Sequence, residues 1–172
     1  MTNNHALSLS PESLPRDGRF GSGPSKVRKE QLAAIQSPPM GTSHRQPGVR
    51  NIVGAIQSGL TELFYLPDGY EVIVGNGGAS ALWDAITFNL VDDRAQTAVI
   101  GEFSGKAARA IERAPWLAAP DVRRVEPGQM VECHTTPGID TYIYAHNETS
   151  TGATTTLKRF GIEARLVDTS DL

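Results

Sequence analysis

The sequence predicts an α/β fold in which helices flank a mostly parallel sheet. Short apolar runs alternate with helical patterns from residue 70 onward, turns separate these segments, and no internal repeat or low-complexity stretch interrupts them. Strands that alternate with helices are typical of parallel sheets, because each helix carries the chain back to the start of the next strand. The 172 residues are enough for one domain with a core.

Two parts are expected along the chain. Residues 1–47 are rich in Pro, Gly and Ser, which predicts an extended arm with one short helix near Lys26–Ile35. Apolar residues then recur at helical spacing over 48–64, which predicts an amphipathic helix. We therefore expect an arm over residues 1–47 and an α/β domain over residues 48–172.

The α/β domain is expected to contain two further helices, over Ala79–Leu90 and Ser104–Arg113. Short apolar runs predict five strands: Tyr70–Gly75, Thr97–Phe103, Val122–Glu126, Asp140–His146 and Ala164–Thr169.

The last strand ends within three residues of Leu172, whereas a parallel sheet is expected to continue into another helix or crossover. The chain is therefore expected to be C-terminally truncated. An incomplete sheet would leave apolar side chains exposed near Val72–Val74 and Tyr142–Tyr144.

Composition argues against several classes of function. The net charge of -3 argues against nucleic acid as a partner, because duplex binders normally carry a basic excess. No apolar run approaches the ~20 residues of a membrane span, and the N-terminus lacks a hydrophobic signal core. With Cys133 as the only cysteine, no disulfide framework or cysteine-based zinc site is expected. We expect a cytoplasmic protein with no metal.

A glycine-rich run, Gly75–Gly78, leads from a predicted strand into a predicted helix. Backbone N–H groups at a helix N-terminus favour a phosphate there. The run matches neither the P-loop pattern nor G-x-G-x-x-G. A glycine turn that serves only close strand–helix packing is an equal alternative.

Three more features stand where strands are predicted to end. Phe103 is placed to stack on a flat cofactor, although such an aromatic is more often part of a core. The polar run Asn147–Gly152 offers hydrogen-bonding groups, although such runs are usually turns. Asp168 is placed to pair with a protonated ring nitrogen, with a helix cap or turn as the alternative.

His44 and Arg45 precede the predicted long helix, and an arginine beside a histidine suits a carboxylate or phosphate. A solvated basic corner is the alternative. Taken together, these features suit a phosphorylated aromatic cofactor with a ring nitrogen. That description fits pyridoxal 5'-phosphate (PLP) better than a nucleotide.

Five stretches resemble the phosphoserine aminotransferases of actinobacterial type: FGSGPSKVR, MGTSHRQPGVRNIV, LPDGYEVIVGNGGASALWDA, GEFSGKA and AHNETSTG, between about Phe20 and Ser170. The resemblance implies an incomplete large PLP-binding domain of a fold-type I aminotransferase. That family is homodimeric and exchanges an amino group between O-phosphoserine and 2-oxoglutarate in serine biosynthesis, giving 3-phosphohydroxypyruvate and glutamate.

The resemblance also implies roles for single residues. Ala79 and Ser80 would bind the cofactor phosphate, and Phe103 would stack on the pyridine ring. Thr149 would donate a hydrogen bond to the ring hydroxyl, and Asp168 would pair with the pyridinium nitrogen.

His44 and Arg45 would bind the phosphate of phosphoserine, by the same resemblance. No catalytic residue is expected in the chain, because the Schiff-base lysine of the family follows the aspartate, and none of the four lysines here does. The chain alone is therefore expected to be inactive. The alternatives are another fold-type I PLP aminotransferase and a non-catalytic α/β fragment.

Overall fold

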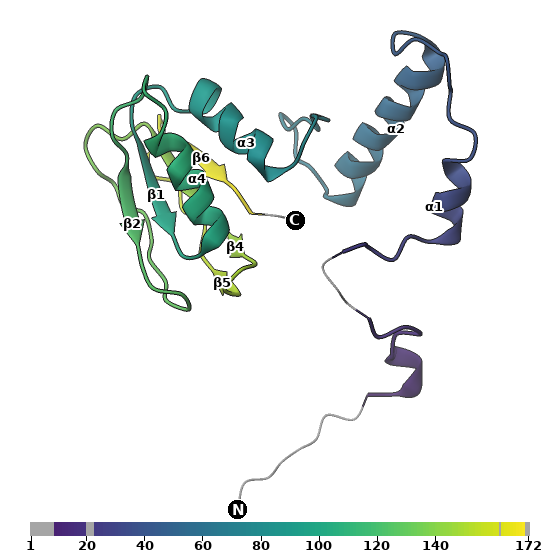
Figure 1. Ribbon diagram of the computed structural model, residues 1–172, viewed down its shortest axis with the longest axis horizontal. Coiled ribbons are helices and arrows are strands. Elements are labelled where there is room, and N and C mark those ends of the chain that lie inside the picture. The colour runs from purple at the N-terminus through teal and green to yellow at the C-terminus, as the bar shows by residue number, and fades with distance from the viewer. Residues whose placement is uncertain (1–8, 20–22, 162, 171–172) are drawn as a thin grey trace, which may run out of the picture. The chain divides into compact units, whose positions relative to one another are not determined.

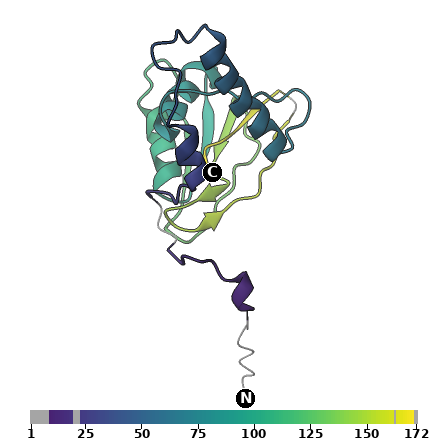
Figure 2. The same ribbon diagram turned by 90° about the vertical axis from the view of Figure 1, so that its right-hand side faces the viewer.

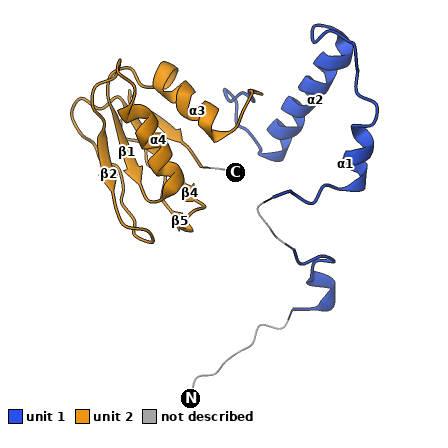
Figure 3. Cartoon of the chain, in the orientation of Figure 1, with its two compact units in different colours: residues 1–73 blue, residues 74–172 orange. Residues whose placement is uncertain are grey.

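The structure is a computed structural model and describes residues 9–19, 23–161 and 163–170. It divides the chain into two compact units, unit 1 from Met1 to Ile73 and unit 2 from Val74 to Leu172 (Figure 3). The predicted boundary after residue 47 falls inside unit 1, and as a domain boundary it stays a prediction. None of the helices in the described residues is long and apolar enough to cross a membrane.

Unit 1 is built from helices. A 3-10 turn, Pro11–Ser13, precedes α1, Lys29–Ala34, and α2, Pro47–Leu63 (Figure 1). Both helices predicted in this part are thereby confirmed. Proline suits the first position of α2, because its missing N–H would have no partner there and its fixed φ is helical.

None of the described residues of unit 1 is buried. The apolar side chains of α2 include Ile52, Val53, Ile56 and Leu63, which are between 37% and 67% exposed. The helix has the amphipathic pattern that the sequence predicts, but its apolar side chains remain accessible to solvent.

The strand predicted over residues 70–75 is wrong. These residues form no strand, and Ile73 is 84% exposed. One side-chain hydrogen bond reaches the segment, from Gln57 Nε2 to the carbonyl of Val72 at 2.9 Å. A strand needs a neighbouring strand for its backbone groups, and within the described residues this segment takes part in no strand pairing.

Unit 2 contains a parallel sheet, as predicted, formed by four of the five expected strands. Its strands stand in the order β2-β1-β3-β6; β2, β1 and β6 are labelled in Figure 1. In the register, Thr97 lies opposite Val122 on one side and Ile143 on the other, and Ile143 lies opposite Val167. The strands are β1 Ala95–Val99, β2 Asp121–Arg124, β3 Thr141–Tyr144 and β6 Arg165–Asp168.

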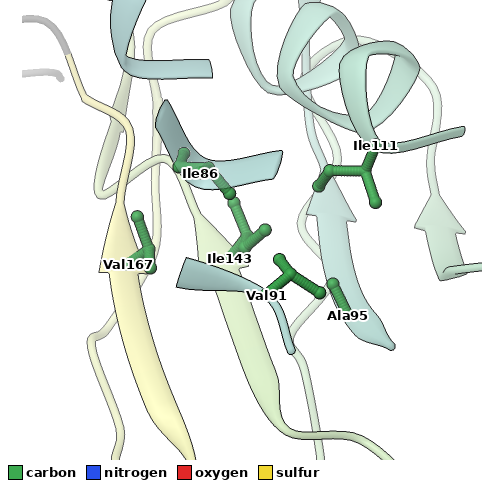
Figure 4. Packing of buried hydrophobic residues seen from close by; sticks show 6 residues of the cluster. All are labelled: Ile86, Val91, Ala95, Ile111, Ile143 and Val167. Carbon is green, nitrogen blue, oxygen red and sulfur yellow. The ribbon is translucent and has the colours of Figure 1, made fainter. Parts of the chain in front are cut away.

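Two helical segments cover one face of this sheet. Helix α3, Ala79–Ala85, continues as a π-helical turn, Ile86–Leu90, and α4 spans Glu102–Glu112. These segments confirm the two predicted helices. Figure 4 shows the core between helices and strands, formed by Ile86, Val91, Ala95, Ile111, Ile143 and Val167.

The opposite face is covered by loops. Tyr142 and Tyr144 are buried there with Cys133, so the expectation that Tyr142–Tyr144 would be exposed is wrong. The ring of Phe160 lies 4.4 Å from that of Tyr142, measured between centroids. Burial raises the pKa of the Cys133 thiol to about 12, which leaves it protonated and unreactive at neutral pH.

A short antiparallel hairpin follows β3 directly (Figures 1 and 2). It pairs β4, Asn147–Glu148, with β5, Ala153–Thr154. The predicted polar turn lies in this hairpin, and Gly152 takes the left-handed conformation there, with φ of +70°. The hairpin therefore sits at the edge of the sheet where β3 ends.

Candidate functional site

Three chain segments leave the sheet at the edge where its parallel strands end. The chain after β1 enters α4, the chain after β3 forms the β4–β5 hairpin, and β6 ends at Asp168. In parallel sheets this carboxyl edge is where ligands gather. Three of the predicted cofactor residues, Phe103, Thr149 and Asp168, lie on these segments.

Asp168 is the last residue of β6, as predicted, and lies opposite Tyr144. Its Oδ1 accepts hydrogen bonds from the amide of His146 at 2.9 Å and from the amide and hydroxyl of Ser170 at 3.0 and 2.7 Å. Within the described part of the chain, no donor reaches Oδ2. One carboxylate oxygen is thus held by the protein, and the other keeps its capacity to accept.

Ser170 was not singled out in the sequence, yet it links two of the three segments. Its hydroxyl donates to Asp168 Oδ1 and accepts from the amide of Asn147 at 2.7 Å. A serine two residues after an aspartate is a local signal for such a turn. The contact to Asn147 joins residues 23 positions apart, so local sequence cannot reveal it.

Phe103 does not end a strand, so this prediction is wrong. Strand β1 stops at Val99, and Phe103 lies half-buried in the first turn of α4. The helix begins early because Ser104 Oγ accepts from the amides of Ile100 and Gly101, at 3.0 and 3.1 Å. The ammonium of Lys106 lies 5.2 Å from the centre of the Phe103 ring.

Glu148 is the second residue that the sequence did not reveal. Glu148 is 1% exposed, and its carboxylate accepts three hydrogen bonds from the start of α4 and one from the Ser150 hydroxyl in the hairpin. Burial by itself would raise the pKa of this carboxyl group. Hydrogen bonds from the hydroxyls of Ser104 and Ser150 and from the amides of Ser104 and Phe103 outweigh burial and hold the pKa below its usual value.

Gly101 allows this close approach between α4 and the hairpin. A Cβ atom at position 101 would overlap the side chains of Glu148 and Ser150. Glycine is required here by space, because the backbone of Gly101 is extended, with φ of 178°.

Thr149 lies between β4 and β5 and is exposed. A cavity of ≈ 220 Å³ opens beside it, lined by Asn147, Glu148, Thr149, Gly152 and Ala153. The hairpin therefore places Thr149 beside a concave surface.

Ala79 and Ser80 are the first two residues of α3, as predicted. The first amides of a helix have no acceptor inside it, so they are available to an anion. Gly77 has φ of +107°, and a Cβ there would lie 2.9 Å from the Cβ of Ala81. In the described residues, no hydrogen bond joins Ala79 or Ser80 to Phe103, Thr149 or Asp168.

His44 and Arg45 belong to unit 1. They occupy a turn before α2, in which the amide of Gln46 donates to the carbonyl of Ser43 at 2.9 Å and the amide of Arg45 donates to the Ser43 hydroxyl at 3.3 Å. Both side chains are exposed. The turn is local, so the structure of unit 1 leaves both side chains accessible to an anion.

The chain is similar to aminotransferases in sequence, although no protein-family model matches it. It is 53% identical over 149 residues to a phosphoserine aminotransferase of Nocardioides sp., which covers 85% of this chain and 40% of the relative. It is 50% identical over 156 residues to a putative phosphoserine aminotransferase of Mycobacterium avium, with 89% and 42% covered. A phosphoserine aminotransferase of Corynebacterium glutamicum is 49% identical over 163 residues, with 92% and 43% covered.

These relatives confirm the predicted resemblance over most of the chain. The chain spans about two fifths of the length of the curated relatives it matches.

Two solved structures share the fold. A phosphoserine aminotransferase from Cytophaga hutchinsonii matches with a TM-score of 0.56 and 23% identity, over 66% of this chain and 32% of that chain. An alanine–glyoxylate aminotransferase from Nostoc sp. matches with a TM-score of 0.57 and 24% identity, over 90% and 42%. The predicted α/β fold, with helices flanking a mostly parallel sheet, is therefore confirmed.

Proposed function

We propose that this chain, which belongs by sequence to the phosphoserine aminotransferase family, forms the part of an aminotransferase that holds the ring and phosphate of PLP. The complete protein would exchange an amino group between O-phosphoserine and 2-oxoglutarate, as a cytoplasmic homodimer in serine biosynthesis. The observation that carries the proposal is Asp168, whose Oδ1 is held by three donors while Oδ2 keeps its capacity to accept.

The donor set at the carboxyl edge fits the chemistry of this cofactor. When bound, PLP draws electrons from the substrate's alpha carbon into a protonated pyridine ring. Asp168 Oδ2 would accept from the ring nitrogen and stabilise its proton. The three hydrogen bonds to Oδ1 restrict rotation of the carboxylate group. The orientation of Oδ2 is therefore fixed before the cofactor binds.

Phe103 and Thr149 would contact the ring from the segments after β1 and β3. The half-buried Phe103 ring offers an aromatic surface, and the exposed Thr149 hydroxyl offers a hydrogen bond to the ring hydroxyl. The amide of Phe103 donates to the Glu148 carboxylate, and Thr149 directly follows Glu148, so one side chain connects the two segments.

The cofactor phosphate would bind at the start of α3. The backbone amides of Ala79 and Ser80 and the Ser80 hydroxyl supply donors, and the helix dipole favours the negative charge. The left-handed Gly77 lets the chain turn sharply before these amides.

The substrate phosphate would bind to His44 and Arg45. A guanidinium pairs with two phosphate oxygens at once, so Arg45 favours O-phosphoserine over serine. A preference for O-phosphoserine over serine distinguishes a phosphoserine aminotransferase from another fold-type I aminotransferase. In solution, R45A should weaken O-phosphoserine binding about tenfold or more and leave the weak binding of serine unchanged, as measured by calorimetry. Equal losses for both amino acids would favour the other aminotransferase.

The cofactor assignment is tested with pyridoxamine 5'-phosphate, which carries the same ring and phosphate and needs no lysine. We expect the chain to bind this ligand saturably, and the change in the absorbance of the ligand measures the binding. D168N should weaken it about tenfold, because a charged hydrogen bond is lost. D92N is the matched control, since Asp92 pairs on the surface with Arg165 at 2.7 Å. Absence of wild-type binding would contradict the proposed function and favour a non-catalytic α/β fragment.

A further inference from the structure

We propose that Glu148 is a positioning residue for the cofactor site, because its buried carboxylate fixes Phe103 relative to Thr149. The inference rests on the proposed function, which assigns these two residues to the pyridine ring. Glu148 itself is 1% exposed and therefore acts through its neighbours.

Each oxygen of the carboxylate is shared by two donors. Oε1 accepts from the amide of Phe103 at 3.2 Å and from the hydroxyl of Ser150 at 2.6 Å. Oε2 accepts from the amide and the hydroxyl of Ser104, at 2.8 and 2.6 Å. One side chain thus connects the hairpin to the first turn of α4.

Thr149 is held from both sides by this cluster. Glu148 precedes it, and Ser150 follows it and accepts from the amide of Glu102 at 2.9 Å. The residues on either side of Thr149 are therefore both hydrogen-bonded to the first turn of α4. That turn contains Phe103, the other predicted ring contact. A shift of the hairpin against α4 would break at least one of these hydrogen bonds.

The cluster requires an acceptor on both oxygens. All four partners donate, so an amide in place of the carboxylate would turn one N–H group toward donors. E148Q keeps the shape of the side chain and replaces one of the two acceptor oxygens by a donor. E102Q is the matched control, because Glu102 lies in the same turn of α4 but its carboxylate is exposed and pairs with Lys106 and Arg109.

The first measurement is the affinity of the chain for pyridoxamine 5'-phosphate. E148Q should weaken binding about tenfold or more, since burying an unmatched polar group affects the positions of both ring contacts. E102Q should remain within about twofold. Unchanged binding in E148Q would overturn the inference.

A double-mutant cycle separates positioning from general damage to the fold. In a chain that already carries F103A and T149A, E148Q should weaken binding by only about twofold, because the contacts that Glu148 positions are gone. A tenfold loss in both backgrounds would show that Glu148 acts on the fold as a whole, which contradicts the inference.

Hydrogen exchange decides the question even if the wild-type chain binds no pyridoxamine 5'-phosphate, an outcome that would count against the proposed function alone. In E148Q the amides of Phe103 and Ser104 should exchange at least about tenfold faster, while the amides of β3 keep their protection. E102Q should leave both sets unchanged. Equal exchange of Phe103 and Ser104 in wild type and E148Q would refute the positioning role.

Discussion

The two units differ in what surrounds their apolar side chains. In unit 2 both faces of the sheet are covered, one by α3 and α4 and the other by loops that pack on Tyr142 and Tyr144. In unit 1 the described side chains are all at least partly exposed, although α2 is amphipathic and spans 17 residues. Helical hydrogen bonds alone give a helix of this length marginal stability in water. We therefore expect the buried core of unit 2 to stabilise the chain more than the exposed apolar face of α2 does.

The largest expected effect separates the two units directly. I143A should lower the free energy of unfolding by about 3 kcal/mol or more, because Ile143 is buried between β1, β6 and the helices, and its loss leaves a cavity. I56A should lower it by less than about 1 kcal/mol, since Ile56 is 44% exposed. Urea unfolding followed by circular dichroism measures both. Equal losses would mean that α2 is buried as deeply as the sheet.

A second, smaller effect concerns the loop before β1. The carboxylate of Asp140 accepts from the amides of Asp92, Asp93 and Arg94, at 3.1, 2.8 and 2.7 Å. Burial alone would raise its pKa, but the hydrogen bond from the Thr141 hydroxyl and these amides outweigh burial and lower it. D140N should destabilise the chain at pH 7 by about 1–2 kcal/mol.

The direction of the pH dependence follows from the lowered pKa of Asp140. The stability that this group contributes is present above its unfolded pKa, about 3.9, and is lost as the pH falls through the folded pKa. D140N should therefore flatten the decline in stability below about pH 4, measured by thermal unfolding between pH 3 and 7. D92N should change stability by less than about 0.5 kcal/mol, because its ion pair with Arg165 is exposed. An unchanged acid profile in D140N would show that the loop does not depend on this carboxylate.

Local pattern predicted the sheet and its helices, because apolar runs and helical periodicity are properties of neighbouring residues. Asp168 was placed correctly at the end of its strand for the same reason. Phe103 was misplaced because α4 begins at Glu102, where Ser104 caps the first turn and the amide of Phe103 donates to Glu148, 45 residues further along the chain. Residues 70–75 have the composition of a strand, but a strand also needs a neighbour, and that is a property of the assembled sheet.

The buried tyrosines illustrate the same limit on sequence prediction. Tyr142 and Tyr144 are covered by segments such as the one around Phe160, which has no regular secondary structure and hence no periodic signal. Glu148 and Ser170 were missed because their hydrogen bonds join segments that are distant in sequence. Candidate ligand contacts were thus visible in the sequence, whereas the residues that hold them were not.

The smallest expected effect tests the segment at the border of the two units. Q57A removes the hydrogen bond from Gln57 Nε2 to the carbonyl of Val72, which is exposed to water. Water replaces such a partner, so the free energy of unfolding should change by less than about 0.5 kcal/mol. R50A is the control, because Arg50 is also exposed on α2 and its replacement by alanine brings a similar gain in helix propensity. A loss of about 1 kcal/mol or more in Q57A beyond R50A would mean that the segment around Val72 folds together with α2, and unit 1 would then be more than a set of locally stabilised helices.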